Sequence, residues 1–353
     1  MSTESFKSKK VLVVGGAGFI GSNLVQQILA HDPREIVIVD NLLSSDVSNV
    51  PDDSRVRFVF GSITNDKILR DLSDDLDYAF HLACYHGNQS SIADPLADHD
   101  NNTYTSLKLF ERLKDFKALK KVVYAAAACA VAEKTYGQPT ATTEDQPVTL
   151  YHDSPYSISK IIGELYGNYY FLHHRLPIVK ARFSNAYGPR EILGAGQWRG
   201  TIHTVWRNVT PTFIWRALNG EALPLDNGGN ASRDFIFVED MARGLMACAL
   251  KGDAGEVYNL ATGKETTILE LANFINEFTG NKAPVDLKPA RDWDRSGKRF
   301  ASTEKAEIQL GFTAQVDIRE GIERTVEWTR NNSDLIAHTI KRHNKFMSQI
   351  SSK

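Results

Sequence analysis

Cysteine is scarce in this sequence, and long hydrophobic runs are absent. Three cysteines, Cys84, Cys129 and Cys248, are spread over 353 residues. Their odd number and wide spacing provide neither a disulfide framework nor a metal-ligand pattern, so we expect no metal site and a reducing, cytoplasmic compartment. The first apolar run, at 11–14, follows a polar segment and is too short for a signal peptide or a membrane span. No membrane association is therefore expected.

A surplus of charge of one sign is missing as well. The chain has 41 Lys and Arg residues against 43 Asp and Glu residues, which gives a formal net charge of −2. Without a basic field over the molecule, neither nucleic acid nor an anionic membrane is expected as a partner. Local groups must then hold any phosphate-bearing ligand. The hydrophobic content of 42% and the chain length suffice for a buried core in one large domain or two coupled ones.

Short apolar runs alternate with longer amphipathic stretches in the first half of the chain. The runs predict strands at 11–14, 36–39, 56–60, 78–83, 122–127 and 178–183, and the amphipathic stretches predict helices that include 22–30, 102–113 and 156–173. Continuous apolar strands that alternate with helices indicate a parallel sheet covered on both faces. The fold class expected is α/β, a Rossmann-type doubly wound parallel sheet with a smaller C-terminal α/β substrate lobe.

After Asn185 the pattern becomes irregular and rich in turn residues. We expect one domain from 1–185 plus about 233–262, and a smaller lobe from 186–232 plus about 263–335. The remaining tail, 336–353, is polar and mildly basic. It is expected to be a solvated surface helix or a frayed end.

Three glycines, Gly15, Gly18 and Gly21, directly follow the first strand and open the first helix. A dinucleotide pyrophosphate needs such a turn, because side chains there would block its approach to the helix N-terminus. Asp40 ends the second strand, 19 residues after Gly21. A carboxylate there accepts hydrogen bonds from the adenosine ribose and repels a 2′-phosphate, and 41–43 contain no arginine, so NAD is favoured over NADP. The alternatives are a ligand-free turn and an aspartate that only starts a turn.

Tyr156 and Lys160 stand four residues apart on an expected helix, so their side chains share one face. An ammonium group near a phenol favours the phenolate and lowers the pKa of the phenol. Tyr156 is therefore a candidate general base for a sugar hydroxyl. An ordinary amphipathic helix is the alternative interpretation.

Taken together, these motifs resemble the extended short-chain dehydrogenase/reductase family, and within it the NAD-dependent nucleotide-sugar epimerases and dehydratases. The resemblance runs from about residue 10 to about residue 330. It is carried by Gly-Gly-Ala-Gly-Phe-Ile-Gly at 15–21, Asp40-Asn41-Leu42, His81-Leu82-Ala83, Asn101-Asn102, Pro155-Tyr156 with Lys160, and the segments 182–189 and 233–240.

The resemblance implies roles for individual residues. The NAD-binding set is Gly15, Gly18, Phe19, Ile20, Gly21, Asp40, Asn41, Ser62, Ile63, Leu82, Ala83, Asn102, Ala125, Tyr156, Lys160 and Phe183. The set for the nucleotide-diphosphate sugar is Asn185, Asn208, Val209, Arg233 and Arg291, with Arg295, Lys298 and Arg299 leaving the register of the last one open. The resemblance also implies a homodimer, paired through helices at about 102–115 and 156–171. The segment 190–206 is expected to shape the choice of sugar.

Two departures from the family pattern bear on the chemistry. Ala127 stands where the family has a serine or threonine, and Ala128 with Cys129 replaces the Asp-Glu pair of the dehydratases. Ser62 replaces an aspartate beside the adenine. Cys129 is either a proton shuttle or a small buried hydrophobe. His86, after the fourth strand, is either a partner acid or base or a structural histidine.

The function expected is an NAD-dependent epimerase of a nucleotide-diphosphate sugar, with a UDP-sugar favoured. It would work through a 4-keto intermediate and invert C4, or alternatively C5 or C3. A 4,6-dehydratase or a keto-sugar reductase is the nearest alternative. A catalytically silent NAD-binding sensor is the alternative from another class.

Overall fold

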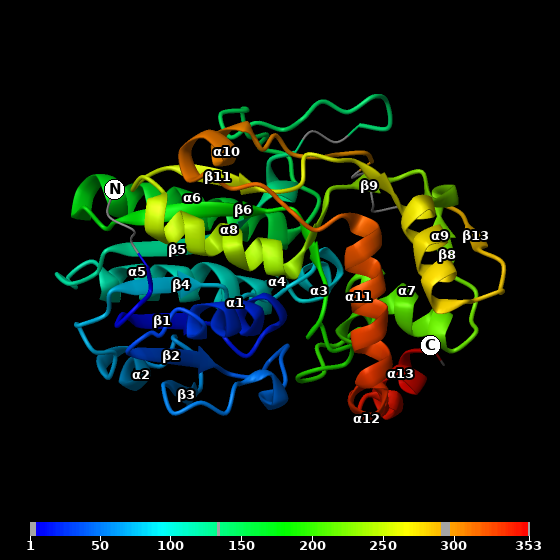
Figure 1. Ribbon diagram of the computed structural model, residues 1–353, viewed down its shortest axis with the longest axis horizontal. Helices are drawn as coiled ribbons and strands as arrows, with labels where there is room; N and C mark the ends of the chain where they lie inside the picture. Colours follow the sequence, from blue (N-terminus) through cyan, green and yellow to red (C-terminus); the bar gives the residue numbers. More distant parts are fainter. Residues whose placement is uncertain (1–4, 133–134, 291–296, 352–353) are drawn as a thin grey trace.

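The computed structural model describes residues 5–132, 135–290 and 297–351, and a seven-stranded sheet lies at its centre (Figure 1). The strands are β1 (Lys10–Val14), β2 (Glu35–Asp40), β3 (Val56–Phe60), β4 (Tyr78–His81), β5 (Lys121–Ala127), β6 (Ile178–Phe183) and β11 (Val257–Leu260). Their order is β11-β6-β5-β4-β1-β2-β3, and every neighbouring pair is parallel. The predicted doubly wound parallel sheet is thus confirmed. The chain reverses its direction of winding between β1 and β4, which opens a crevice at the carboxyl ends of the strands.

Helices cover both faces of this sheet. α1 (Phe19–Leu29) and α8 (Val238–Lys251) bury their apolar sides against one face, and α5 (Thr105–Leu113) and α6 (Pro155–His174) cover the other. The other helices are α2 (Asp66–Arg70), α3 (Asn88–Ala93), α4 (Pro95–Asp98), α7 (Val209–Leu218), α9 (Ile268–Thr279), α10 (Glu304–Leu310), α11 (Ile318–Asn331), α12 (Ser333–Lys341) and α13 (Asn344–Ser351). Among the helices in the described ranges, none has the length and apolar character that a bilayer span requires.

A smaller lobe lies beside the carboxyl ends of the sheet. α7, α9 and α11 pack there around a common apolar core that includes Ile214, Leu271 and Ile322. Three two-stranded sheets accompany them: β7 (Asn185–Tyr187) with β10 (Phe235–Phe237), β8 (Pro224–Asp226) with β13 (Asp286–Lys288), and β9 (Ser232–Arg233) with β12 (Thr266–Thr267). The segment 233–262 is therefore shared: β10 pairs with β7, whereas α8 and β11 join the large sheet. The exact domain limits stay a proposal.

The tail, expected as a solvated surface helix or a frayed end, forms two surface helices with one packed side. α12 and α13 pack under the second lobe, and the side chains of Thr339 and His343 are buried. Thr339 Oγ1 donates to the carbonyl of Leu193 at 2.7 Å, and His343 Nε2 lies 2.9 Å from the carbonyl of Gly194. These contacts join segments nearly 150 positions apart, which local polarity does not reveal.

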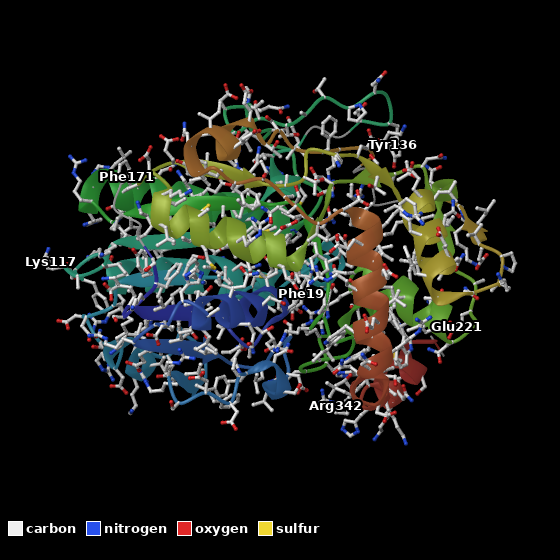
Figure 2. All side chains as sticks on the ribbon, viewed as in Figure 1. Phe19, Lys117, Tyr136, Phe171, Glu221 and Arg342 are labelled. Carbon is white, nitrogen blue, oxygen red and sulfur yellow. The ribbon has the colours of Figure 1, made fainter. Side chains whose placement is uncertain are left out.

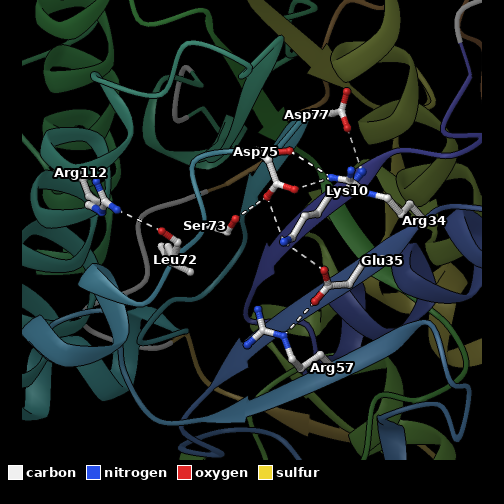
Figure 3. A network of polar contacts seen from close by, with 9 residues as sticks. All are labelled: Lys10, Arg34, Glu35, Arg57, Leu72, Ser73, Asp75, Asp77 and Arg112. Atoms are coloured by element: carbon white, nitrogen blue, oxygen red, sulfur yellow. Dashed lines mark hydrogen bonds and ion pairs between the residues drawn. The ribbon is translucent and has the colours of Figure 1, made fainter.

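Charged side chains at the amino ends of β1 and β2 pair with one another (Figure 3). Lys10 Nζ lies 3.1 Å from Glu35 and 3.0 Å from Asp75, and Arg57 Nε donates to Glu35 at 2.9 Å. Arg34 also pairs with Asp75, at 2.8 Å. This end of the sheet thus satisfies its charges internally, in contrast to the carboxyl end, where charged groups face a cavity.

Candidate active site

A cavity of about 420 Å³ opens at the carboxyl ends of β1, β2, β4, β5 and β6. Its volume is in the range of small-molecule sites. Most of the predicted site residues line it: Gly15, Gly18, Phe19, Ile20, Gly21, Asp40, Asn41, Ser62, Ile63, Leu82, Ala83, His86, Ala125, Cys129, Tyr156, Lys160, Phe183, Asn185, Asn208 and Val209. The sheet therefore brings together residues from many separate motifs, as the crevice of a doubly wound fold does.

The glycine turn provides room for a dinucleotide. Gly15 has φ +86°, and a Cβ there would lie 2.5 Å from the backbone nitrogen of Ala83. A Cβ on Gly21 would lie 2.1 Å from the carbonyl oxygen of Gly15. Gly18 precedes α1 without a side-chain cap, and Phe19 begins the helix at its end toward the second lobe (Figure 2). The N-terminal amides of α1 are thus open to a diphosphate, which fits the expected cofactor.

Asp40 is held rigidly at the edge of the cavity. Its Oδ2 accepts a hydrogen bond from the Ala17 amide at 3.0 Å, and its Oδ1 accepts from the Leu42 amide and the Ser45 hydroxyl, both at 2.9 Å. Burial raises the pKa of Asp40, and these hydrogen bonds oppose that rise. A carboxylate so placed suits the ribose hydroxyls of an adenosine.

Arg207 reaches the loop next to Asp40 from the second lobe, and sequence reasoning missed it because the two segments are far apart in the chain. Its guanidinium donates to the carbonyls of Ser44, Ala195 and Thr204, at 2.8, 2.6 and 3.1 Å. Burial lowers the pKa of Arg207 to about 9. An arginine beside Asp40 would favour NADP by binding its 2′-phosphate, but the guanidinium of Arg207 already donates to these carbonyls. The preference for NAD over NADP that Asp40 predicts therefore stays our prediction.

Tyr156 and Lys160 face the cavity from the first turns of α6. Ser154 caps this helix by accepting from the Ser157 amide, and Pro155 begins it, which sets Tyr156 at the cavity edge. Lys160 Nζ lies 5.7 Å from the centroid of the Tyr156 ring, and it donates to the carbonyl of Ala125 at 2.9 Å.

Two opposing effects act on the pKa of Tyr156. Burial raises it well above the usual value, and the thiols of Cys84 and Cys129 add to the effect. Desolvation of the phenolate thus opposes the lowering of this pKa by Lys160. That lowering, with oxidised nicotinamide as a second positive charge, stays our prediction for the NAD-bound protein.

His86 lies against the ring of Tyr156, with the two rings edge to face and their centroids 5.8 Å apart. Its Nε2 is 3.0 Å from Oδ1 of Asn208, and the amide nitrogen of Asn208 donates to Glu191. Burial lowers the pKa of His86 and raises the pKa of Glu191 to about 7. Glu191 was not predicted, since a lone glutamate after Tyr-Gly-Pro-Arg carries no spacing signal.

Alanine and cysteine end β5 at the cavity. Ala127 is the last residue of the strand, and Ala128–Ala130 form a short 3₁₀ turn. Both Ala127 and the half-buried Cys129 line the cavity. The structure thus places a thiol, and no hydroxyl, at the end of this strand.

Asn102 does not line the cavity. Its Oδ1 accepts from the Tyr85 amide at 2.7 Å, and its Nδ2 donates to Asp98 at 2.7 Å. The neighbouring Asn101 lines the cavity instead. This placement does not support the expected cofactor contact of Asn102 and indicates that it orders the loop after β4.

The predicted diphosphate arginines are placed differently from one another. Arg233 lies outside the cavity lining and donates to the carbonyls of Ser232 and Gly297, at 2.6 and 2.7 Å. Arg291 lies outside the described residues. Arg299, an open alternative for that register, does line the cavity, as does Arg190 from the Tyr-Gly-Pro-Arg segment. The described residues contain no cluster of three or more His, Cys, Asp or Glu suited to a metal.

Residues 11–261 match the NAD dependent epimerase/dehydratase family. The UDP-glucose 4-epimerase of Mycolicibacterium smegmatis is 31% identical over 330 residues, with 92% of this chain and 99% of that protein covered. A dTDP-glucose 4,6-dehydratase of Streptomyces antibioticus is 30% identical, with 91% of this chain and 92% of that protein covered.

Among solved structures, this chain is similar to the Bordetella bronchiseptica enzyme WbmF in complex with NAD+ and UDP. The two share 56% identity and a TM-score of 0.88, over 98% of this chain and 99% of that chain. Sequence match, fold and cavity agree with one another. This chain belongs to the NAD dependent epimerase/dehydratase family, within the extended short-chain dehydrogenases/reductases, and NAD is its cofactor.

Proposed function

We propose that the chain is an NAD-dependent epimerase of a UDP-sugar, working through a 4-keto sugar and inverting C4, or alternatively C5 or C3. The observation that carries the proposal is the shared cavity. Tyr156 and Lys160 line the same cavity as the glycine turn of the cofactor site and as Asn185 of the second lobe. A sugar held between these walls would present a hydroxyl to the phenol.

Tyr156 is the proposed general base for the sugar 4-hydroxyl. When bound, NAD supplies a hydride acceptor and, in its oxidised form, a positive charge near the phenol. Burial holds the proton on Tyr156, so nearby cations must stabilise the phenolate before it can accept the proton of a substrate hydroxyl. Lys160, anchored on the carbonyl of Ala125, is the fixed cation that the chain itself provides. It would also orient the nicotinamide ribose.

The nucleotide diphosphate of the sugar needs cations and amide donors in the same cavity. Arg190 and Arg299 both line it, as do Asn185 and Val209. Arginine offers a bidentate fork to phosphate oxygens, so these two side chains suit a diphosphate. UDP is favoured because the similar enzyme WbmF was crystallised with UDP and NAD+.

The residues at the end of β5 favour epimerisation over dehydration. A 4,6-dehydratase of this family uses an acid and a base that follow the strand, and Ala128 and Cys129 occupy those positions here. A single thiol cannot replace two carboxyl groups that eliminate water. One of the similar proteins is nevertheless a dTDP-glucose 4,6-dehydratase, so dehydration is the alternative reaction that the test must exclude.

The test is to incubate the NAD-bound protein with a panel of UDP-sugars and to identify the products by NMR. We expect one sugar to convert into an epimer that differs at a single carbon. The Tyr156→Phe variant should lose this turnover by 10²-fold or more, with NAD affinity by calorimetry nearly unchanged. The exposed Tyr169 on the same helix provides the matched control, Tyr169→Phe. A 4-keto-6-deoxy product, a reduced product or no turnover with any sugar would contradict the proposal.

A further inference from the structure

His86 is joined to the second lobe by a chain of two hydrogen bonds. It lies in the loop after β4, and its Nε2 is 3.0 Å from Oδ1 of Asn208, the residue that precedes α7. Asn208 Nδ2 in turn donates to Oε1 of Glu191. The side chain of Asn208, expected to hold the diphosphate, is thus engaged on both of its polar atoms.

The direction of these hydrogen bonds follows from the groups themselves. Above about pH 7, where Glu191 is ionised, its carboxylate only accepts, so it requires the NH₂ group of Asn208 on its side. The carbonyl oxygen of Asn208 then faces His86, and because a carbonyl also only accepts, Nε2 of His86 must donate. If the side-chain amide of Asn208 were reversed, its carbonyl oxygen would face the buried carboxylate of Glu191. Two acceptors would then meet without a proton between them, which costs free energy.

The neutral ring leaves only one tautomer for His86. Burial lowers the pKa of this histidine, with Arg199 and Arg207 nearby adding to the effect, while Asn208 and Glu191 oppose it. A neutral imidazole carries one proton, and the bond to Asn208 places it on Nε2. Nδ1 therefore keeps its lone pair.

This Nδ1 has no hydrogen-bond partner among the described residues, and His86 lines the cavity beside Tyr156. The next residue, Gly87, has φ +106°, and a Cβ there would meet no described atom within 4 Å. A lone pair at this place suits a donor on a ligand.

We infer that Glu191, acting through Asn208, positions His86 as the Nε2–H tautomer, so that Nδ1 accepts a hydrogen bond from a hydroxyl or amide N–H of a ligand in the cavity. Glu191 and Asn208 are positioning residues, and His86 is the group that meets the ligand. The donor is either a sugar hydroxyl or a group of the cofactor, both of which offer this chemistry. The assignment of the donor to a sugar hydroxyl rests on the proposed function, whereas the tautomer of His86 does not.

The tautomer is tested at about pH 8, where Glu191 is ionised. The method is NMR of the NAD-bound protein labelled with ¹⁵N-histidine, with the His86 signals assigned by their loss in His86→Phe. We expect a pyridine-like Nδ1 and a pyrrole-like Nε2. Glu191→Gln keeps an acceptor for Asn208 and should keep this pattern. Glu191→Met removes the acceptor and should give averaged signals of both tautomers. His343, whose Nε2 faces the carbonyl of Gly194, is the internal control and should not change.

A protonated Nδ1 in the wild-type protein would overturn the inference, and so would a Glu191→Met spectrum identical to that of the wild type. The ligand is tested by comparing the protein before and after NAD, and again after UDP-glucose. A shift of Nδ1 on adding NAD assigns the donor to the cofactor, and a shift only with UDP-glucose assigns it to the sugar nucleotide. If neither addition shifts Nδ1, the ligand contact is wrong, even where turnover supports the proposed function.

Discussion

At the scale of single residues, Cys129 is the position where chemistry is least constrained by the family pattern. It lines the cavity together with Tyr156, and Ala127 beside it has no group that exchanges protons. Inversion at C5 or C3 would require a side chain that removes a carbon-bound proton from a keto sugar, whereas inversion at C4 would not. Cys129 is the candidate on this strand end for that proton.

The prediction is therefore conditional on the carbon that is inverted. If product formed in deuterated water carries deuterium at C5 or C3, Cys129→Ser should lose roughly 10²-fold in rate and Cys129→Ala should lose deuterium uptake, because a positioned acid or base has that effect. If no deuterium enters, both variants should stay active. NMR of the product measures both quantities. Deuterium at C5 or C3 with an equally fast Cys129→Ala variant would show that another group moves the proton.

Glu191 gives the protein a pH dependence of stability with a definite sign. Burial raises its folded-state pKa to about 7 from a usual 4.5, while Asn208, His86 and Arg207, which face it, oppose the rise. A raised pKa means that this group favours the folded state below the usual pKa, and that the contribution is lost as pH rises through about 7. The loss is on the order of 3 kcal/mol at most.

Wild type should thus lose stability relative to Glu191→Gln between about pH 5 and about pH 8. Urea unfolding of both proteins at the two pH values measures the difference. Parallel changes in the two proteins would mean that Glu191 titrates normally in the folded state.

At the scale of helices and strands, prediction succeeded where the pattern was local. The apolar runs at 36–39 and 178–183 fall within β2 and β6, and the 156–173 stretch falls within α6. The strand predicted at 78–83 ends at His81, and Leu82 and Ala83 after it line the cavity.

The type of the helix before α5 could not be predicted from the sequence. The helix expected from 102 begins earlier as a π-helix, His99–Tyr104, before α5. Amphipathic spacing alone does not separate these two helix types.

At the site, glycine spacing and the Tyr156–Lys160 pair were sufficient to find the cofactor side. Glu191 and Arg207 could not be predicted, because they reach the cavity only when the second lobe packs against the sheet.

The tail helices support a segment of the site. His343 of the tail holds the carbonyl of Gly194, and Trp198 stacks on Phe346 with ring centroids 5.3 Å apart. The tail near Arg342 lies beneath α11 (Figure 2). Residues 190–195 carry cavity-lining side chains, so the tail supports the cavity wall from behind.

We predict that His343→Ala weakens UDP binding by the NAD-bound protein about fivefold, because an unpaired buried carbonyl costs about 1 kcal/mol. NAD affinity should fall less than UDP affinity, because the supported segment meets the cofactor side through the loop of Leu43 and Ser44. Calorimetry with each ligand measures both values, and Lys345→Ala, at an exposed position on the helix that follows His343, is the control. Equal loss of NAD and UDP affinity would indicate general unfolding instead.

At the scale of the whole molecule, α6 presents an exposed apolar face. Ile158, Leu165 and Leu172 are 45%, 61% and 60% exposed, and Tyr169 is 48% exposed. Such a row on one helix is typical of an interface. It agrees with the predicted pairing of helices at about 102–115 and 156–171.

A homodimer is therefore expected at micromolar concentration by light scattering. Leu165→Glu should shift the mass to that of a monomer, because a charge would be buried at the interface. Ile308→Glu, which changes an apolar residue on α10 that is 74% exposed, should leave the dimer intact. A monomer mass for the unchanged protein would reject the expectation.

The central claim is that this site inverts a sugar carbon without net oxidation or loss of water. Mass spectrometry of the sugar nucleotide, combined with NADH absorbance during turnover by the NAD-bound protein, tests it most directly. The account predicts a product of unchanged mass that separates from the substrate by chromatography, with no accumulation of NADH. A product lighter by one water, or NADH formed in proportion to product, would contradict it.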